Sequence, residues 1–140
     1  MQKYPNKQYD CYHVNANLYQ EFLENYFYRM MRIGFRKIFV LTGHYPNADI
    51  GKLAAQKYKN TKIIVVKEPD LIEGTTGDHA GKWETSLLLA LFPKLVDLKL
   101  MDGKKDRLRA VEGDDPASST VEYGNELLNK MIYRIEELLR

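Results

Sequence analysis

The sequence predicts an α/β fold in which a mainly parallel sheet is flanked by helices in three layers. Two short apolar runs, 37–41 and 61–67, have the continuous hydrophobic character of strands covered on both faces. Segments with helical periodicity precede, separate and follow these runs, which is the order typical of parallel sheets. A chain of 140 residues, 44% hydrophobic and 29% charged, can bury a core. We therefore expect residues 1–140 to form a single domain.

The first helix is expected from Leu18 to Met31. Asn15 or Asn17 can cap its start, and Gly34 suits the position just past its end. The expectation depends on apolar residues that recur at three- and four-residue steps, as on one face of an amphipathic helix: Leu18, Phe22, Tyr26, Phe27, Met30 and Met31.

The middle of the chain continues with the strand at 37–41, and Asn47 is expected to cap a helix from Ala48 to about Tyr58. The second strand, 61–67, follows this helix. A long loop then runs from Glu68 to Gly81, and loops of this length inside a compact domain are often functional.

The rest of the chain predicts two more helices. One runs from Lys82 to about Leu91 and stops before Pro93. Residues 95–113 mix short apolar runs with charge and have no assignment from sequence. The segment Ser119-Thr120-Val121-Glu122 has the spacing of a capping box, and it predicts a final helix that runs to about Leu139.

The composition limits the partners and the compartment. A net charge of +2 gives no electrostatic case for nucleic acid or a membrane surface. No apolar run approaches the length of a membrane span. The one cysteine, Cys11, cannot form an internal disulfide and suits a reducing compartment. We therefore expect a cytoplasmic protein without nucleic-acid or membrane partners.

Two histidine-containing segments are the candidates for chemistry. Thr42-Gly43-His44-Tyr45-Pro46-Asn47 directly follows the first strand, and His79-Ala80-Gly81-Lys82-Trp83-Glu84-Thr85-Ser86 opens the helix after the second. Because ligands sit at the carboxyl ends of parallel strands, we expect the two segments to converge. Imidazole and carboxylate together suit a hydrolytic metal site, with Glu84 binding the cation and His79 moving protons.

Structural roles compete with this interpretation. Asp78 can cap the helix and Glu84 can favour its positive end, although neither role explains His79. Asn47 can hold its loop, cap a helix or touch a substrate. His13 is best read as a surface residue. No nucleophile elbow and no glycine-rich phosphate motif is present in the sequence.

The chain resembles the creatininase family of metal-dependent amidohydrolases. The second segment is similar to the family's His-Ala-Gly-x-x-Glu-Thr-Ser signature, and Gly43-His44 to Asn47 resembles its Gly-His-x-x-Asn loop. Leu91 to Val96, and Gly113-Asp114-Asp115-Pro116 to Gly124, resemble later family segments. The resemblance covers nearly the whole chain from about Leu18.

The resemblance implies an α/β hydrolase with two divalent metals per site, zinc or manganese. Such an enzyme opens a C–N bond of an amide or cyclic amide with metal-activated water. His44 would bind one metal and Glu84 the other, while His79 would act near the leaving group. A small-molecule amide would contact a further set of residues: Tyr45, Asn47, Asp78 and Trp83.

The chain also departs from the family pattern. Pro46 stands where some members have a metal-binding acid, and nothing before Leu18 resembles the family's Glu-x-His segment or the Asp that bridges both metals. We therefore expect a domain that lacks the family's N-terminal strand-helix portion, and a homo-oligomer, because a missing strand exposes backbone and apolar surface. Alternatives are a non-catalytic remnant or oligomerisation module, or an unrelated small binding module.

Overall fold

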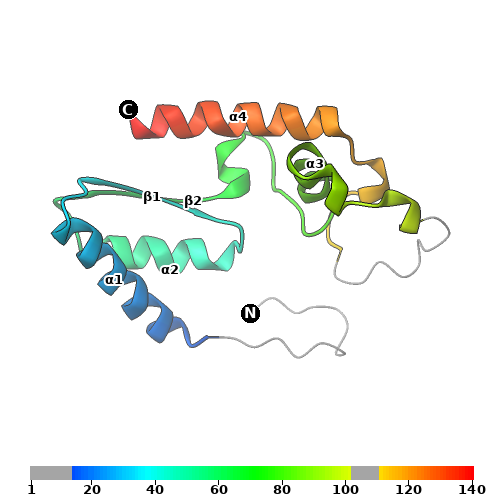
Figure 1. Cartoon of the computed structure of the whole chain (residues 1–140). Coiled ribbons are helices and arrows are strands. Elements are labelled where there is room, and N and C mark those ends of the chain that lie inside the picture. The colour runs from blue at the N-terminus through cyan, green and yellow to red at the C-terminus, as the bar shows by residue number, and fades with distance from the viewer. Residues whose placement is uncertain (1–13, 102–110) are drawn as a thin grey trace. The chain divides into compact units, whose positions relative to one another are not determined.

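The structure is a computed structural model that describes residues 14–101 and 111–140 (Figure 1). Cys11 and His13 lie outside the described residues. The chain divides into two compact units. The first comprises Met1–Glu68, described from residue 14, together with Leu138–Arg140; the second comprises Pro69–Glu137. The expectation that residues 1–140 form one domain stays a prediction. In the described part of the chain, no helix has the length and apolar character needed to cross a bilayer.

From residue 14 onward, the first unit contains two helices and two strands. Their order is α1 (Ala16–Arg32), β1 (Lys37–Thr42), α2 (Pro46–Ala55) and β2 (Lys62–Lys67). The strands pair in parallel, with Lys37 opposite Lys62 at one end and Thr42 opposite Lys67 at the other. Both expected strands and the α/β class are therefore confirmed.

The core of the first unit lies between the helices and one face of the sheet. Phe27 of α1 is 1% exposed and meets Tyr58 edge to face, with ring centroids 6.5 Å apart. Leu23 and Ala54 complete the buried centre of this cluster. Side chains two apart on β1, Ile38 and Val40, pack against it, because alternate residues of a strand point to one face. Burial of these apolar groups holds the helices on the sheet.

The boundaries of α1 confirm the sequence interpretation. The Asn15 side chain accepts hydrogen bonds from the backbone N–H groups of Asn17, at 2.9 Å, and Leu18, at 3.4 Å. These two bonds satisfy donors that a helix start leaves unpaired. Gly34 follows the helix with φ of 105°, a conformation that glycine adopts at little cost.

The expected cap of α2 was wrong. Asn47 lies inside the first turn. Tyr45 occupies the N-cap position, and its side chain does not cap the helix. Pro46 begins the helix, because its ring already holds the helical φ and its missing N–H would have been unpaired there. The helix ends at Ala55, three residues before the expected Tyr58.

The described part of the second unit contains α3 (Lys82–Leu91), most of α4 (Val121–Leu139) and short 3-10 segments, the first of which begins at the last residue of the first unit. The helix at Lys82–Leu91 and the end of α4 are as expected. The 3-10 segments fall in stretches of sequence without clear periodicity. They are η1 (Glu68–Leu71), η2 (Pro93–Leu95), η3 (Leu98–Met101) and η5 (Pro116–Ser118).

The start of α4 packs closely on α3. A Cβ on Gly124 would lie 2.0 Å from the Ser86 carbonyl oxygen, so only glycine permits this approach. Ser86 is fully buried, and its Oγ accepts a hydrogen bond from the Thr120 N–H at 3.2 Å.

The expected capping box is shifted by one residue. Thr120, and not Ser119, accepts from the backbone N–H of Tyr123, at 3.1 Å. The Ser119 hydroxyl instead donates to the Lys82 carbonyl oxygen of α3, at 3.3 Å. The Ser119 hydroxyl therefore makes a tertiary contact and does not form the cap of α4 that the local sequence pattern predicts.

Candidate active-site segment

Asp78 organises the start of α3 in the second unit. Its Oδ2 accepts from the Trp83 N–H at 2.6 Å, and its Oδ1 accepts from the Glu84 N–H at 3.1 Å. A carboxylate placed at the N-terminus also interacts favourably with the helix dipole. The capping role considered for Asp78 is therefore what its carboxylate performs, from three residues before the N-cap Gly81.

Glu84 turns back from the first turn of α3 toward the loop. Its Oε2 accepts a hydrogen bond from the Ala80 N–H at 2.7 Å. Ala80 has φ of 51°, and it is the one non-glycine residue with positive φ among those described. This conformation costs about 1–2 kcal/mol for a residue with a Cβ. Backbone strain of this kind gathers at functional sites, where the surrounding contacts maintain it.

The loop before α3 is crowded around Asp78. A Cβ on Gly81 would lie 2.4 Å from the Asp78 Oδ2, and a Cβ on Gly113 would lie 2.6 Å from the Asp78 Cβ. Gly113 also has φ of 105°. Both glycines are therefore required by close approach to one carboxylate side chain.

His79 is held by its backbone. It forms an isolated antiparallel bridge with Glu112, through two hydrogen bonds of 2.9 Å between their backbone groups. Next to this bridge, the Lys82 N–H donates to the Asp114 carbonyl oxygen at 3.0 Å. The His79 side chain is exposed. The loop therefore holds the His79 backbone in place at an exposed position.

The other candidate residues lie in the first unit. His44 is exposed in the turn after β1, and its carbonyl oxygen accepts from the Thr42 hydroxyl at 2.9 Å and from the Asn47 N–H at 3.0 Å. Tyr45 and Asn47 are partly buried at the start of α2. Because His44 belongs to one unit and His79 and Glu84 to the other, their expected convergence stays a prediction.

The histidine and carboxylate side chains of the candidate segments are of the kind that binds a divalent cation, but too few of them lie together to hold one. Imidazole and carboxylate are ligands that zinc and manganese accept. Within residues 14–101 and 111–140, however, no group of three or more His, Cys, Asp or Glu side chains could hold an ion. The carboxylate of Asp78, the nearest acid in sequence to His79, is occupied by the start of α3. The described residues therefore supply at most part of a metal site.

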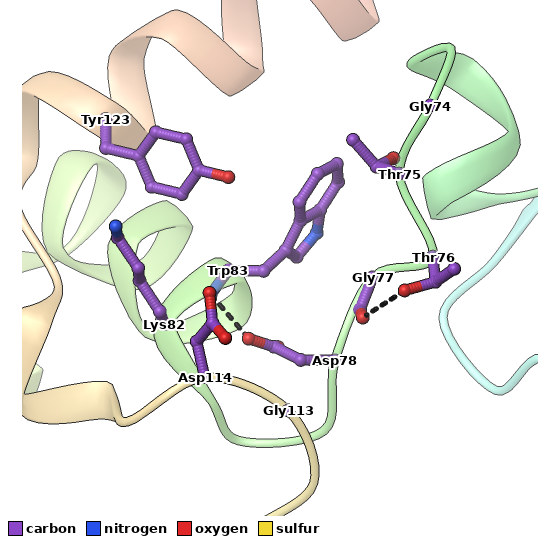
Figure 2. A pocket seen from close by; sticks show the side chains of 10 residues that line it. All are labelled: Gly74, Thr75, Thr76, Gly77, Asp78, Lys82, Trp83, Gly113, Asp114 and Tyr123. Carbon is purple, nitrogen blue, oxygen red and sulfur yellow. Dashed lines mark hydrogen bonds between the residues drawn. The ribbon is translucent and has the colours of Figure 1, made fainter.

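A pocket of about 240 Å³ opens beside the same loop (Figure 2). It is lined by residues 74–78, Lys82, Trp83, residues 113–114 and Tyr123. Trp83 is 4% exposed, and its indole Nε1 is buried without a hydrogen-bond partner among the described residues. An unsatisfied buried donor costs about 1–3 kcal/mol. Trp83 therefore lines a pocket, and its expected contact with a substrate stays a prediction.

Sequence reasoning did not identify several residues of this pocket, namely Thr75, Thr76, Lys82, Asp114 and Tyr123. They come from three separated segments with no shared motif, so no local pattern could have grouped them. The weak signal available was Gly113-Asp114 itself, a turn that closes on the loop at Asp78.

A parallel β-strand pair packed with helices defines the chain as an α/β protein. Comparison with known proteins makes this more specific. The family model described as creatinine amidohydrolase matches residues 11–139, and the chain therefore belongs to the creatininase family.

Individual relatives agree with this assignment. A creatinine amidohydrolase from Pseudomonas putida is 34% identical over 92 residues, which cover 49% of this chain and 35% of that protein. A manganese form of creatininase has a TM-score of 0.73 at 21% identity, covering 92% of this chain and 65% of the other. A mutant creatininase of Zn-Zn type has a TM-score of 0.72 at 22% identity, with the same coverage.

These comparisons support the fold, and zinc or manganese as the metals of the family. The chain spans about a third of the length of the curated relative and less than two thirds of the solved chains. It therefore corresponds to part of the structure that those proteins have.

Proposed function

We propose that this chain provides part of the active site of a metal-dependent amidohydrolase. In this proposal, His44 and Glu84 bind divalent metal, and His79 transfers a proton near the leaving group of a C–N amide or cyclic amide bond. Other side chains, from a polypeptide segment beyond those described, complete the metal site. The observation that carries the proposal is the geometry of residues 78–84.

That geometry leaves Glu84 suited to bind a cation. The Oε2 of Glu84 accepts a hydrogen bond from the Ala80 N–H. Its Oε1 accepts none from the described residues and therefore remains available to a cation. The bond also restricts the carboxylate to one orientation, which reduces the entropy lost on binding. Bound metal would supply an activated water and polarise the substrate carbonyl.

His79 suits the proton transfer because imidazole changes protonation near neutral pH. Its backbone is held by the bridge to Glu112 while the side chain stays exposed. A group that must meet substrate has to combine a fixed backbone with an accessible ring. Tyr45 and Asn47, beside His44, and Asp78 and Trp83, beside His79, are the proposed substrate contacts.

The proposed substrate is a small amide, with creatinine as the first compound to assay, because the named relative acts on it. The proposal also includes a homo-oligomer, supported by exposed apolar residues on α1, and a cytoplasmic location, supported by the single cysteine. The alternative is a non-catalytic protein that keeps the fold. The small number of metal ligands in the described chain favours this alternative.

The test is hydrolysis of creatinine by the full chain loaded with zinc or with manganese, followed as release of creatine. We expect His79→Gln to lower kcat about 100-fold or more without changing metal content, because general acid–base catalysis contributes about that much. Glu84→Gln should lose metal and activity together. His13→Gln, outside both motifs, is the matched control. Turnover that survives both substitutions would contradict the assigned roles, and an inactive wild-type protein in both metal forms would favour the non-catalytic alternative.

A further inference from the structure

The outer edge of β2 has no partner strand among the described residues, where the sheet consists of β1 and β2. Lys62 directs its backbone toward β1, since its N–H donates to the Arg36 carbonyl oxygen at 3.2 Å. Backbone groups of successive residues in a parallel strand point to opposite edges. Those of Ile63 and Val65 therefore point away from β1. An unpaired strand edge of this kind is a template for a further strand.

A pocket of about 320 Å³ opens beside β2 at these two residues. Helix α2 forms its other wall and packs closely, because a Cβ on Gly51 would lie 2.9 Å from the Val65 Cγ1. Val65 is 7% exposed and Ile63 is only partly buried, so Ile63 is the more accessible position of the edge. Besides these two strand residues, the pocket is lined by Lys52, Ala55, Gln56, Tyr58, Lys59 and Thr61.

Both charged side chains of this lining are positive. Lys52 and Lys59 are exposed, and neither forms an ion pair with a described residue, whereas the neighbouring Lys57 is paired with Glu24. Lys52 also complements the negative end of α2, but Lys59 lies beyond the helix and has no such role. The pocket therefore has a positive charge that a carboxylate of a partner can match with charge-assisted hydrogen bonds.

The strand itself carries none of the usual protection of a sheet edge. Exposed edges are commonly protected by a charged residue, a proline or a bulge within the strand. Residues 63–66 are isoleucine and valine, without charge or proline. Lys52 and Lys59 lie outside the strand, so they repel a basic segment and attract an acidic one without blocking the edge.

We propose that the outer edge of β2 binds an extended acidic segment of a partner protein as an added strand. Backbone groups of this segment pair with those of Ile63 and Val65. Side chains of neighbouring strands point to the same face, so its aspartate or glutamate side chains enter the pocket and bind Lys52 and Lys59. None of these residues belongs to the proposed metal site, and binding here is therefore independent of the proposed function.

The probe is a fluorescent hexapeptide with blocked ends that alternates valine and glutamate, titrated into the full chain and followed by fluorescence anisotropy. We expect saturable binding, and binding at least about tenfold weaker for a peptide that alternates valine and lysine. Two further peptides carry N-methyl groups on the valines or on the glutamates. Only one of them should lose binding, because an added strand presents alternate backbone groups to the edge.

Two of the possible results with these peptides would overturn the proposal. Absence of saturable binding would show that the edge does not accept such a segment. Equal binding of both N-methylated peptides and the parent peptide would show that charge alone attracts them, without strand pairing.

Lys52→Glu combined with Lys59→Glu checks the location, and Lys94→Glu combined with Lys99→Glu, at exposed positions of the second unit, is the matched control. The first variant should bind the glutamate peptide at least about fivefold more weakly and the lysine peptide more tightly. Unchanged circular dichroism would show that the fold is retained. An equal loss in the control would overturn the proposal. So would self-association of the peptide-free wild type that the first variant abolishes, because the edge would then bind a second copy of this chain.

Discussion

The carboxylate of Glu84 accepts a hydrogen bond from the backbone N–H of Ala80, at 2.7 Å, and Ala80 adopts a left-handed conformation with φ of 51°. The turn that brings this N–H to the carboxylate therefore occurs at a residue for which it is costly. The carboxylate in turn satisfies a backbone donor of the loop before α3. The metal-ligand role proposed for Glu84 and the strained backbone at Ala80 therefore concern one local structure.

The substitutions Ala80→Gly and Gly81→Ala, at adjacent positions, should have opposite effects on the stability of the protein. Ala80→Gly relieves the left-handed strain, of about 1–2 kcal/mol, and adds chain entropy to the unfolded state, of about 0.4–1 kcal/mol. We expect stability equal to the wild type or slightly higher. Gly81→Ala should lower the free energy of unfolding by about 1–3 kcal/mol, because its Cβ would meet the Asp78 Oδ2 at 2.4 Å.

Urea unfolding of the two variants measures this difference, with each serving as the control for the other. A destabilised Ala80→Gly, or a Gly81→Ala with wild-type stability, would mean that the loop does not have the described conformation.

Removal of the Asp78 carboxylate should loosen the start of α3. We expect Asp78→Ala to lower the free energy of unfolding by about 1–2 kcal/mol, because the N–H groups of Trp83 and Glu84 lose their acceptor. Hydrogen exchange should speed up at these two amides. Glu136→Ala, at an exposed position of α4, is the control. Exchange at Trp83 and Glu84 that does not differ from the control would show that another group caps the helix.

The ion pair between Glu24 of α1 and Lys57 gives the first unit a pH dependence. Lys57 Nζ lies 2.5 Å from the Glu24 Oε2. The hydrogen bond from Lys57, followed by that from Gln20, lowers the pKa of Glu24 below its ordinary 4.5. The hydrogen bond to Glu24 raises the pKa of Lys57 above its ordinary 10.5.

The signs of these shifts define the pH window. A lowered carboxylate pKa contributes stability above pH 4.5 that is lost as pH falls through the folded-state value. A raised ammonium pKa contributes stability below pH 10.5 that is lost as pH rises through its folded-state value. Urea unfolding of the wild type and of Lys57→Met should show that the wild type has the larger free energy of unfolding between pH 4.5 and 10.5. This difference should shrink at acid pH. Added salt should reduce it, because the pair is exposed. A difference independent of pH and salt would rule out the ion pair as its source.

The exposed apolar residues of α1 should mediate self-association. Leu18 and Phe22 are each 61% exposed and Tyr26 is 47% exposed, at four-residue steps along one side of the helix. Phe22 stacks with Tyr26 at 6.3 Å between ring centroids, which makes a continuous aromatic surface. We expect Phe22→Ser to weaken assembly at least tenfold in sedimentation velocity, since burial of such a side chain contributes about 1.5–3 kcal/mol. Leu91→Ser, on α3, is the control. A wild-type monomer at high concentration would refute this surface as an interface.

Local signals in the sequence were sufficient for most elements of the fold. The two strands and α1 follow from apolar runs and helical periodicity, which depend on short-range pattern. Asn47 failed as a cap because Pro46, one residue earlier, is a stronger start signal than an asparagine. Ser119 failed as a cap because its hydroxyl reaches the Lys82 carbonyl on α3, a tertiary contact that no local pattern contains.

The candidate site was predictable only in its motif residues. His79 and Glu84 could be proposed as site residues because they lie within one short segment with a helix start. The Trp83 pocket could not, because Asp114 and Tyr123 approach it only through the packing of the Gly113 turn and α4 on α3. Glycine is required at positions 113 and 124 for a similar reason, because each lies against a segment distant in sequence.

The metal-binding roles proposed for His44 and Glu84 are tested most directly by zinc titration of the full chain in isothermal calorimetry. We expect near-stoichiometric zinc binding that weakens at least about tenfold in His44→Ala and in Glu84→Gln, while His13→Ala and Glu136→Gln bind as the wild type does. Zinc binding that is absent from the wild type, or that is lost equally in the control variants, would contradict the claim.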